Sequence, residues 1–375
     1  MMNPGCESAI LRKFGITDEC SLSPVGNGLI HTTLLVSTAG RPAFVLQRLN
    51  TVVFPDPAIL ANNAQVVTQR LRDAVVARGG DVTREVLQFL PARDGRLFAE
   101  AEDGSYWRLS HYVSDSTSVD IAGSSQEAGS VARAFASFLR DLWDLSPDLV
   151  QDAIPGFHDT PKRYSRYQTV LEKTRAAAVA DSGAGEGTDN RRDRFARAGD
   201  LVEAILARAD LLSVIESERL SGLLSTHICH NDTKVNNVLL DETSRDPLCV
   251  IDLDTIGRGS PLMDVGDLLR TAAATASEEE QDPGRVAADP EAALAIVHAF
   301  ADVLDERLNA REHQLLPFSG WIITMEQCIR YLTDYLEGDV YYGERYPGHN
   351  LCRAQNQLAL ARSMEESFVD LRSIR

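Results

Sequence analysis

Short β-rich runs and turns fill the first 113 residues, and helical patterns fill almost all of the rest. Strands are predicted at Thr32–Ser37, Ala43–Asn50, Val86–Leu90, Leu97–Ala101 and Tyr106–Val113. A helix from Asp56 to Arg78 is predicted between the second and third of them, because Asp-Pro opens it and Gly-Gly ends it. Separation of strands from helices is typical of α+β folds. We therefore expect an antiparallel β lobe over residues 1–113 and a mainly helical lobe over 114–375.

The later part of the chain carries apolar residues at three- and four-residue steps, notably over 131–142, 294–308 and 321–336. This spacing predicts amphipathic helices with one buried face. Two Gly-, Pro- or charge-rich stretches interrupt the pattern, Asp181–Asp189 and Ser277–Arg285. Such composition predicts mobile surface loops rather than functional elements.

Composition excludes several classes of protein. The chain has 375 residues with 37 Lys+Arg and 55 Asp+Glu, so its formal charge is −18. This balance argues against a non-specific nucleic-acid binder or an anionic-membrane binder, because both need clustered positive charge. No apolar run reaches the ~18 residues that span a bilayer, and the N-terminus does not resemble a signal peptide. Six widely spaced cysteines give no zinc or disulfide pattern, so we expect a cytoplasmic protein with reduced thiols.

The strongest chemical signal lies between Thr226 and Ile256. Residues 230–237, HNDTKVNN, read as H-x-D-x-x-x-x-N and run into an apolar strand. Asp252 follows fifteen residues after Asn237, at the end of a second apolar run. Phosphoryl transfer from ATP requires this set of groups. One carboxylate orients the attacking hydroxyl, while an Asn oxygen and a second carboxylate hold Mg²⁺.

HNDTKVNNVLLD followed by VIDLDT resembles the aminoglycoside phosphotransferase-like kinase family, and is most similar to bacterial N-acetylhexosamine 1-kinases. Further matches are GNGLIHTTLLV, FVLQRLN, VFPDP, IPGFHDTPKRY and IRYLTDYLEGDVYY, so the resemblance runs from about Gly26 to Glu366. It implies a two-lobed, protein-kinase-like fold of the α+β class. It also implies an ATP- and Mg²⁺-dependent enzyme that phosphorylates the anomeric hydroxyl of N-acetylglucosamine (GlcNAc) or N-acetylgalactosamine (GalNAc).

The resemblance assigns roles around the catalytic loop. Asp232 matches the catalytic base and contacts the substrate, while Asn237 and Asp252 match the metal ligands. We expect His230 to pack and hydrogen-bond rather than carry protons. Asp254 is either a supporting carboxylate or a sugar contact. The pair Asp264 and Asp267 is expected to cap a helix and brace the loop, since a helix start stabilises carboxylates.

ATP contacts are expected from the first lobe. Gly26, Asn27 and Gly28 would fold over the phosphates, because small residues let backbone N–H groups approach anionic oxygens. Arg48 takes the place of the lysine that binds phosphates in protein kinases. Its usual helix glutamate is replaced, with Asn62 near that position. The main chain of His111, Tyr112 and Val113 would hold the adenine.

Ile30, Asp254, Arg330 and Tyr341 are the predicted acceptor contacts, together with Asp232. For Arg330 and Tyr341 the alternatives are a surface salt bridge and a core aromatic. The expected partners are therefore a small sugar and ATP, with no nucleic acid and no membrane.

Other functions remain open from the residues alone. The acceptor could be an aminoglycoside, choline or another sugar, and choline would need an aromatic cage. A nucleotide-binding pseudokinase scaffold is a further alternative, supported by the missing helix glutamate. A phosphatase of the haloacid-dehalogenase type is excluded, because only about a dozen residues, none of them lysine, separate Asp252 from Asp264.

Overall fold

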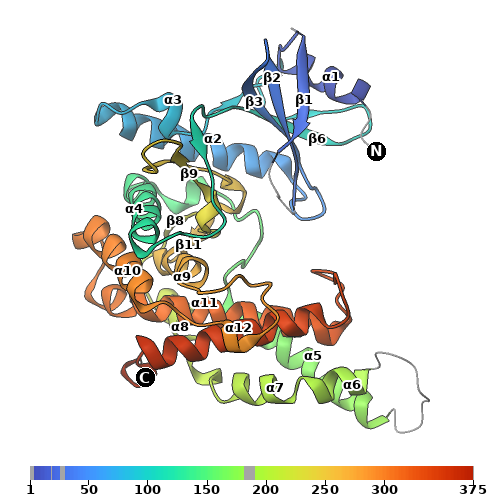
Figure 1. Cartoon of the computed structure of the whole chain (residues 1–375), viewed down its shortest axis with the longest axis vertical. Helices are drawn as coiled ribbons and strands as arrows, with labels where there is room; N and C mark the ends of the chain where they lie inside the picture. The colour runs from blue at the N-terminus through green and yellow to red at the C-terminus, as the bar shows by residue number, and fades with distance from the viewer. Residues whose placement is uncertain (1–3, 18, 26–29, 181–190, 375) are drawn as a thin grey trace.

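The computed structural model describes residues 4–17, 19–25, 30–180 and 191–374, and it has two lobes (Figure 1). The first lobe is an antiparallel sheet in the order β1-β2-β3-β6-β4, with β5 also paired to β6. Its strands are β1 (Cys20–Pro24), β2 (Thr32–Thr38), β3 (Arg41–Arg48), β4 (Phe89–Leu90), β5 (Ala99–Glu100) and β6 (Tyr106–His111). The predicted antiparallel lobe is confirmed. β1 is an additional strand that the sequence patterns did not indicate.

The two faces of this sheet have different neighbours. One face packs against α1 (Pro4–Lys13) in a small core of Ile10, Leu11, Phe14, Leu34, Val36, Leu46, Trp107 and Leu109. On the opposite face Thr33, Gln47 and Arg108 lie side by side in register on three adjacent strands. Neighbouring residues of a strand point to opposite faces, so this polar row is separated from the α1 core.

Helix α2 (Pro57–Ala77) connects the lobes rather than belonging to the sheet alone. The Asp56 side chain accepts a hydrogen bond from the Ala58 backbone, and Pro57 occupies the first helical turn. The buried face of α2 includes Val67, Leu71 and Val75, which join the large core of the second lobe. The division at residue 113 therefore remains a prediction.

The second lobe is mainly helical, as predicted. Its longer helices are α4 (Ser125–Leu142), α5 (Thr160–Ala180), α9 (Pro261–Ala272), α10 (Pro290–Leu304), α11 (Ala310–Glu337) and α12 (His349–Ser367). Shorter ones are α6 (Arg191–Arg197), α7 (Gly199–Leu206) and α8 (Val214–Leu220). The four-residue helix α3 (Val82–Glu85) lies beside α2, before β4. Helix α11 packs against α5, α9 and α12, and its Trp321 and Tyr331 are fully buried.

Short strands lie at the junction of the lobes. β9 (Val238–Asp241) and β10 (Pro247–Val250) form the predicted antiparallel hairpin, and β7 (Ser116–Thr117) pairs with the other edge of β9. β8 (His227–Cys229) pairs with β11 (Gly257–Gly259). These pairings bring residues 230–237 and 251–256 together.

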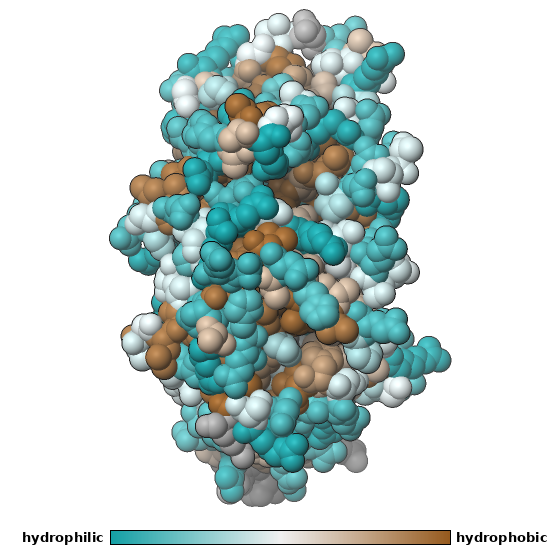
Figure 2. All heavy atoms as spheres, turned by 90° about the vertical axis from the view of Figure 1, so that its left-hand side faces the viewer, coloured by the Kyte–Doolittle hydropathy of each residue, from teal (hydrophilic) through white to brown (hydrophobic). Residues whose placement is uncertain are grey.

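Hydrophilic side chains dominate the face of the molecule drawn in Figure 2, and apolar ones appear there in small separate groups. Across the described residues, no helix combines the length and the apolar character that crossing a membrane requires.

Close approach of α9 and α11 depends on Gly266. A Cβ at this position would lie 2.4 Å from the backbone oxygen of Ser319. Gly266→Ala should therefore destabilise the fold by about 1–3 kcal/mol, the usual cost of overpacking. Gly199→Ala is the matched control, because a Cβ there meets no atom within 4 Å. Chemical denaturation should show a loss for the first variant only, and equal stabilities would contradict the packing argument.

Candidate active site

The catalytic loop is held by the first turn of α9. Both carboxylate oxygens of Asp264 accept backbone hydrogen bonds, from His230 at 2.9 Å and from Asn231 at 2.7 Å. The Thr233 hydroxyl donates to the Asp264 carbonyl oxygen at 2.5 Å. Burial raises the pKa of Asp264, and the two N–H groups partly offset this. Asp264 thus braces the loop.

His230 is a packing residue in this structure. Its ring is buried edge-on against Phe135 and Phe138, with centroid distances of 5.4 and 5.7 Å. Its Nε2 lies 2.9 Å from the Ile251 carbonyl oxygen, and its Nδ1 accepts from the Asp232 backbone at 3.3 Å. The ring therefore connects the loop to the strand that precedes Asp252.

Asp232 lies between a cation and an amide. Lys234 Nζ is 2.9 Å from Asp232 Oδ1, and Asn237 Nδ2 donates to Asp232 Oδ2 at 3.0 Å. Burial acts to raise the pKa of Asp232, but Lys234, His230 and Asn237 outweigh it and hold the pKa below its usual range. The carboxylate is therefore ionised at neutral pH and can accept a proton or orient a hydroxyl.

Asp252 has the left-handed conformation, with φ of 61° and ψ of 59°. The backbone N–H of Ile251 donates to the Asn237 carbonyl oxygen at 2.9 Å, which keeps Asp252 beside the loop. Within the described residues its carboxylate has no hydrogen-bond or ion-pair partner. Burial and the negative charges of Asp254 and Asp232 raise its pKa.

These groups fit a magnesium ion that is bound mainly by nucleotide phosphates. Groups of three or more His, Cys, Asp or Glu able to hold a metal are absent from the part of the chain that the structure describes. Mg²⁺ commonly uses only one or two protein carboxylates together with phosphates. Asn237 donates through Nδ2, so its Oδ1 and the unpartnered Asp252 carboxylate remain as hard oxygen donors.

Asp254 is buried in a polar cluster between the lobes. The Arg108 guanidinium binds both of its oxygens, with Nη2 at 2.7 Å from Oδ2. His31 Nε2 also lies 2.7 Å from Asp254 Oδ2. Burial acts to raise the pKa of Asp254, but Arg108 and His31 outweigh it and lower the pKa strongly. Asp254 therefore supports the site through protein partners, and its predicted sugar contact is not needed to explain its burial.

A comparison with protein families agrees with this geometry. The model described as the phosphotransferase enzyme family (APH) matches residues 21–293. The chain belongs to this phosphotransferase family. It is accordingly an enzyme that transfers phosphoryl groups to hydroxyl acceptors of small molecules, with the two-lobed kinase-like fold.

Solved structures share the fold of this phosphotransferase at low sequence identity. An aminoglycoside phosphotransferase from Alicyclobacillus acidocaldarius is 15% identical, with 100% of this chain and 96% of that chain covered and a TM-score of 0.61. A microcompartment-associated aminopropanol kinase is 14% identical, with coverages of 99% and 98% and a TM-score of 0.55. A spectinomycin phosphotransferase in complex with ADP and spectinomycin is 12% identical, with coverages of 94% and 95% and a TM-score of 0.55.

The structure does not bring Arg48 to the catalytic cluster of this phosphotransferase. Arg48 pairs in register with Trp107, on the α1 side of the sheet, and its Nη2 lies 3.5 Å from Asp103 Oδ2 at a half-exposed position. Asn62 donates instead to the Leu149 carbonyl oxygen at 3.2 Å. The two residues expected to replace the kinase Lys–Glu pair therefore have separate partners.

Other predicted nucleotide contacts are only partly placed. Gly26, Asn27 and Gly28 lie outside the described residues. In the segment expected to hold adenine, the backbone N–H of His111 donates to Gln88 and that of Tyr112 to Ala43, each at 2.9 Å. These two donors serve the sheet, while Val113 begins the connection to the second lobe.

Ile30 is 44% exposed, next to His31 at the start of β2. This exposure does not test the predicted contact between Ile30 and the acceptor, which stays a prediction. His31 is the residue of this segment that reaches Asp254, which follows the β9–β10 hairpin.

Arg330 and Tyr341 belong to one aromatic wall. The Arg330 guanidinium carbon lies 5.4 Å from the Phe157 ring centre and 5.7 Å from that of Tyr342. Tyr341 meets Tyr342 edge-on at 4.8 Å and is 60% exposed, so it is not a core residue. Arg330 Nη1 donates to Gln327 Oε1 at 2.6 Å, so the alternative of a surface salt bridge does not hold.

A second guanidinium reaches the same wall. Arg163 Nη2 donates to the Phe157 carbonyl oxygen at 3.1 Å, and burial together with the Arg330 charge lowers its pKa. Neither arginine forms an ion pair with a carboxylate in the described ranges. The nearby Glu326 is bound by His158 at 3.0 Å and Thr160 at 2.6 Å, and His158 also contacts the Asn231 carbonyl oxygen. The wall is thus attached directly to the catalytic loop.

The segment Ser277–Arg285 is anchored rather than free. Glu278 lies 3.2 Å from Arg270 and 2.6 Å from Arg353, and it accepts from the Tyr331 hydroxyl at 3.0 Å. These cations lower the pKa of Glu278 to about 2 against the effect of burial. The prediction of a mobile surface loop is therefore wrong here, because its charges have partners on α9, α11 and α12. The other predicted loop, Asp181–Asp189, lies outside the described residues.

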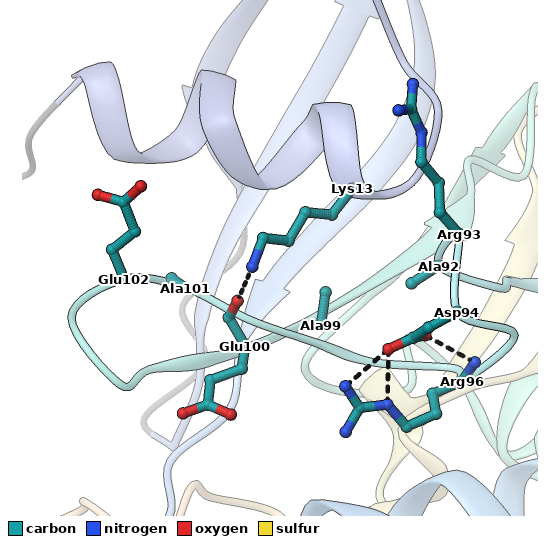
Figure 3. A pocket seen from close by; sticks show the side chains of 9 residues that line it. All are labelled: Lys13, Ala92, Arg93, Asp94, Arg96, Ala99, Glu100, Ala101 and Glu102. Carbon is teal, nitrogen blue, oxygen red and sulfur yellow. Dashed lines mark hydrogen bonds and ion pairs between the residues drawn. The ribbon is translucent and has the colours of Figure 1, made fainter.

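Two cavities of the structure lie outside the catalytic pair, since neither is lined by Asp232 or Asp252. One of about 390 Å³, lined by charged residues including Lys13, Asp94 and Arg96, lies on the α1 side of the sheet (Figure 3). Its Asp94 and Arg96 pair with each other at 2.6 Å. A smaller one of about 140 Å³ is lined by Phe157, His158 and Asn231, together with Thr255 and residues 257–260.

Sequence reasoning missed Lys234, His31, Arg108 and Arg163. Lys234 had a local signal, since a cation two residues after a catalytic carboxylate can reach it. Arg108 and His31 gave no such signal, because their shared partner Asp254 is 146 and 223 residues away.

Proposed function

We propose that this phosphotransferase uses Mg-ATP to phosphorylate the anomeric hydroxyl of GlcNAc or GalNAc, giving a sugar 1-phosphate and ADP. The observation that carries the transfer chemistry is the ionised Asp232 carboxylate, held by Lys234 and Asn237 next to Asp252. The observation that favours a neutral sugar is the pair of guanidinium groups, those of Arg163 and Arg330, at the aromatic wall.

In this proposal Asp232 orients the anomeric hydroxyl and accepts its proton as the bond to phosphorus forms. An anomeric hydroxyl is more acidic than other sugar alcohols, so a carboxylate of low pKa is adequate. A loose transition state also demands little deprotonation before the attack, and positioning therefore contributes as much as basicity.

Asn237 Oδ1 and the Asp252 carboxylate would hold the magnesium ion. Bound there, Mg²⁺ neutralises charge on the phosphates and fixes their orientation. Gly26, Asn27, Gly28 and the main chain of residues 111–113 would hold the nucleotide, as the resemblance implies.

The acceptor would lie against Phe157, Arg330 and Tyr341. Guanidinium groups donate to hydroxyl and amide oxygens, which an N-acetylhexosamine presents in number. A polycationic aminoglycoside or choline would instead meet the positive charges of Arg163 and Arg330, which form no ion pair among the described residues, and like charges at short range disfavour binding. This electrostatic arrangement favours a neutral acceptor.

The proposal is tested by ADP release from Mg-ATP with GlcNAc, GalNAc, glucose, choline and kanamycin in parallel. We expect GlcNAc or GalNAc to raise the rate above the rate without acceptor, and choline and kanamycin to leave it unchanged. Consumption of choline or kanamycin in preference to the sugars would contradict the proposal while leaving the phosphotransferase assignment in place.

A further inference from the structure

Kinases of this type pair a cation on the sheet with a carboxylate, and the cation binds phosphates. The positions expected to carry that pair here, Arg48 and Asn62, have separate partners and do not meet. A different buried pair, Arg108 and Asp254, joins the two lobes just after the β9–β10 hairpin.

The register of the sheet directs Arg108 toward Asp254 and away from the α1 core. It lies opposite Gln47, which is the neighbour of Arg48 and occupies the other face of β3. Arg108 Nε donates to Gln47 Oε1 at 2.9 Å, and Gln47 Nε2 donates to Thr33 Oγ1 at 3.3 Å. This row of hydrogen bonds fixes the direction of the Arg108 side chain.

The guanidinium retains unused donors next to the metal ligands. A guanidinium has five N–H groups, and Gln47 and Asp254 take three of them. Asp254 comes two residues after Asp252.

His31 completes the positioning of Asp254. Its Nδ1 accepts a hydrogen bond from the Asn50 backbone at 3.0 Å, which leaves Nε2 to donate to Asp254 Oδ2 at 2.7 Å. Asp254 is thus held from β6 by Arg108 and from the start of β2 by His31. The carboxylate fixes the guanidinium in the way that a helix glutamate fixes the kinase lysine.

We propose that Arg108 binds the nucleotide phosphates, with Asp254 as its positioning residue. In this proposal the phosphate-binding cation lies on β6 instead of the neighbouring strand β3. Its acidic partner lies in the turn after β10 instead of on α2. This inference rests on the proposed use of ATP. The proposal explains why neither Arg48 nor Asn62 needs to reach the phosphates.

The test is calorimetric binding of Mg-ADP and of adenosine to the full-length protein. The main variant combines Arg108→Gln with Asp254→Asn, so that no buried charge is left unpaired. We expect its Mg-ADP affinity to fall at least about tenfold, as for a lost charge-assisted hydrogen bond, with adenosine affinity unchanged. Arg48→Gln, the matched control on the other face, should bind Mg-ADP like the unaltered protein.

A second variant covers failure of the double variant to fold. Arg108→Lys keeps the charge but cannot bridge Asp254 and a phosphate with a planar fork, so it should also weaken Mg-ADP binding. Unaltered Mg-ADP affinity in either folded variant, or a loss confined to Arg48→Gln, would overturn the assignment of Arg108. Absence of Mg-ADP binding by the unaltered protein would overturn the proposed ATP function together with it.

Discussion

Asp232→Asn should lower turnover by ~100-fold or more, while folding and ATP binding stay close to those of the unaltered protein. The asparagine keeps the shape and the hydrogen bond with Asn237 but cannot accept the proton of the acceptor. Lys234 loses its ion pair, yet its side chain is 44% exposed and can be solvated. Steady-state kinetics, the thermal unfolding midpoint and ATP affinity measure the three quantities separately.

The matched control for this variant is Asp246→Asn, at an exposed position in the β9–β10 turn. It makes the same chemical change on the same hairpin and should leave turnover unaltered. Normal turnover in Asp232→Asn would end the assignment of Asp232 as the base. An equal loss of ATP affinity would place the defect in nucleotide binding instead.

Asp252→Asn should remove most of the magnesium dependence of ATP binding. Asparagine tolerates the left-handed backbone at this position but supplies no negative charge to the metal. Loss of supporting groups alone costs 10–100-fold in metal affinity, so loss of the carboxylate ligand should weaken Mg-ATP binding by about 100-fold or more. ATP titrations with and without Mg²⁺ measure this difference.

The same variant has an expected effect on stability. Burial and the charges of Asp254 and Asp232 raise the pKa of Asp252, so its ionised form is disfavoured in the folded protein. A neutral asparagine removes this repulsion, and the unfolding midpoint at neutral pH without metal should be maintained or raised. Mg-ATP affinity equal to that of the unaltered protein would show that Asp252 is not a metal ligand.

The catalytic loop and hairpin could be predicted from the sequence because their elements are local. His230, Asp232 and Asn237 lie within eight residues, and the apolar runs on either side of a turn indicate the hairpin directly. Asp264, whose carboxylate braces the loop, lies in the first turn of α9. Hydrogen bonds to Ile251 and Asp264, 21 to 34 residues further along the chain, hold these positions.

Long-range contacts explain the rest. Strand position predicts the phosphate-binding role for Arg48, but a shift of one residue moves a side chain to the opposite face of a sheet. Gln47, not Arg48, shares a face with Arg108. The acidic run Glu278–Glu280 has the composition of a surface loop. Its ordering depends on Arg270 and Arg353, which the sequence does not identify as neighbours.

The central claim is that the phosphate is transferred to the anomeric oxygen of an N-acetylhexosamine. The most direct measurement is phosphorus–proton coupling in the product formed from GlcNAc and Mg-ATP. Phosphate at C1 should couple to the anomeric proton, and the product should lose its reducing character. A product that still reduces, with phosphorus coupled to the C6 protons, would contradict the claim.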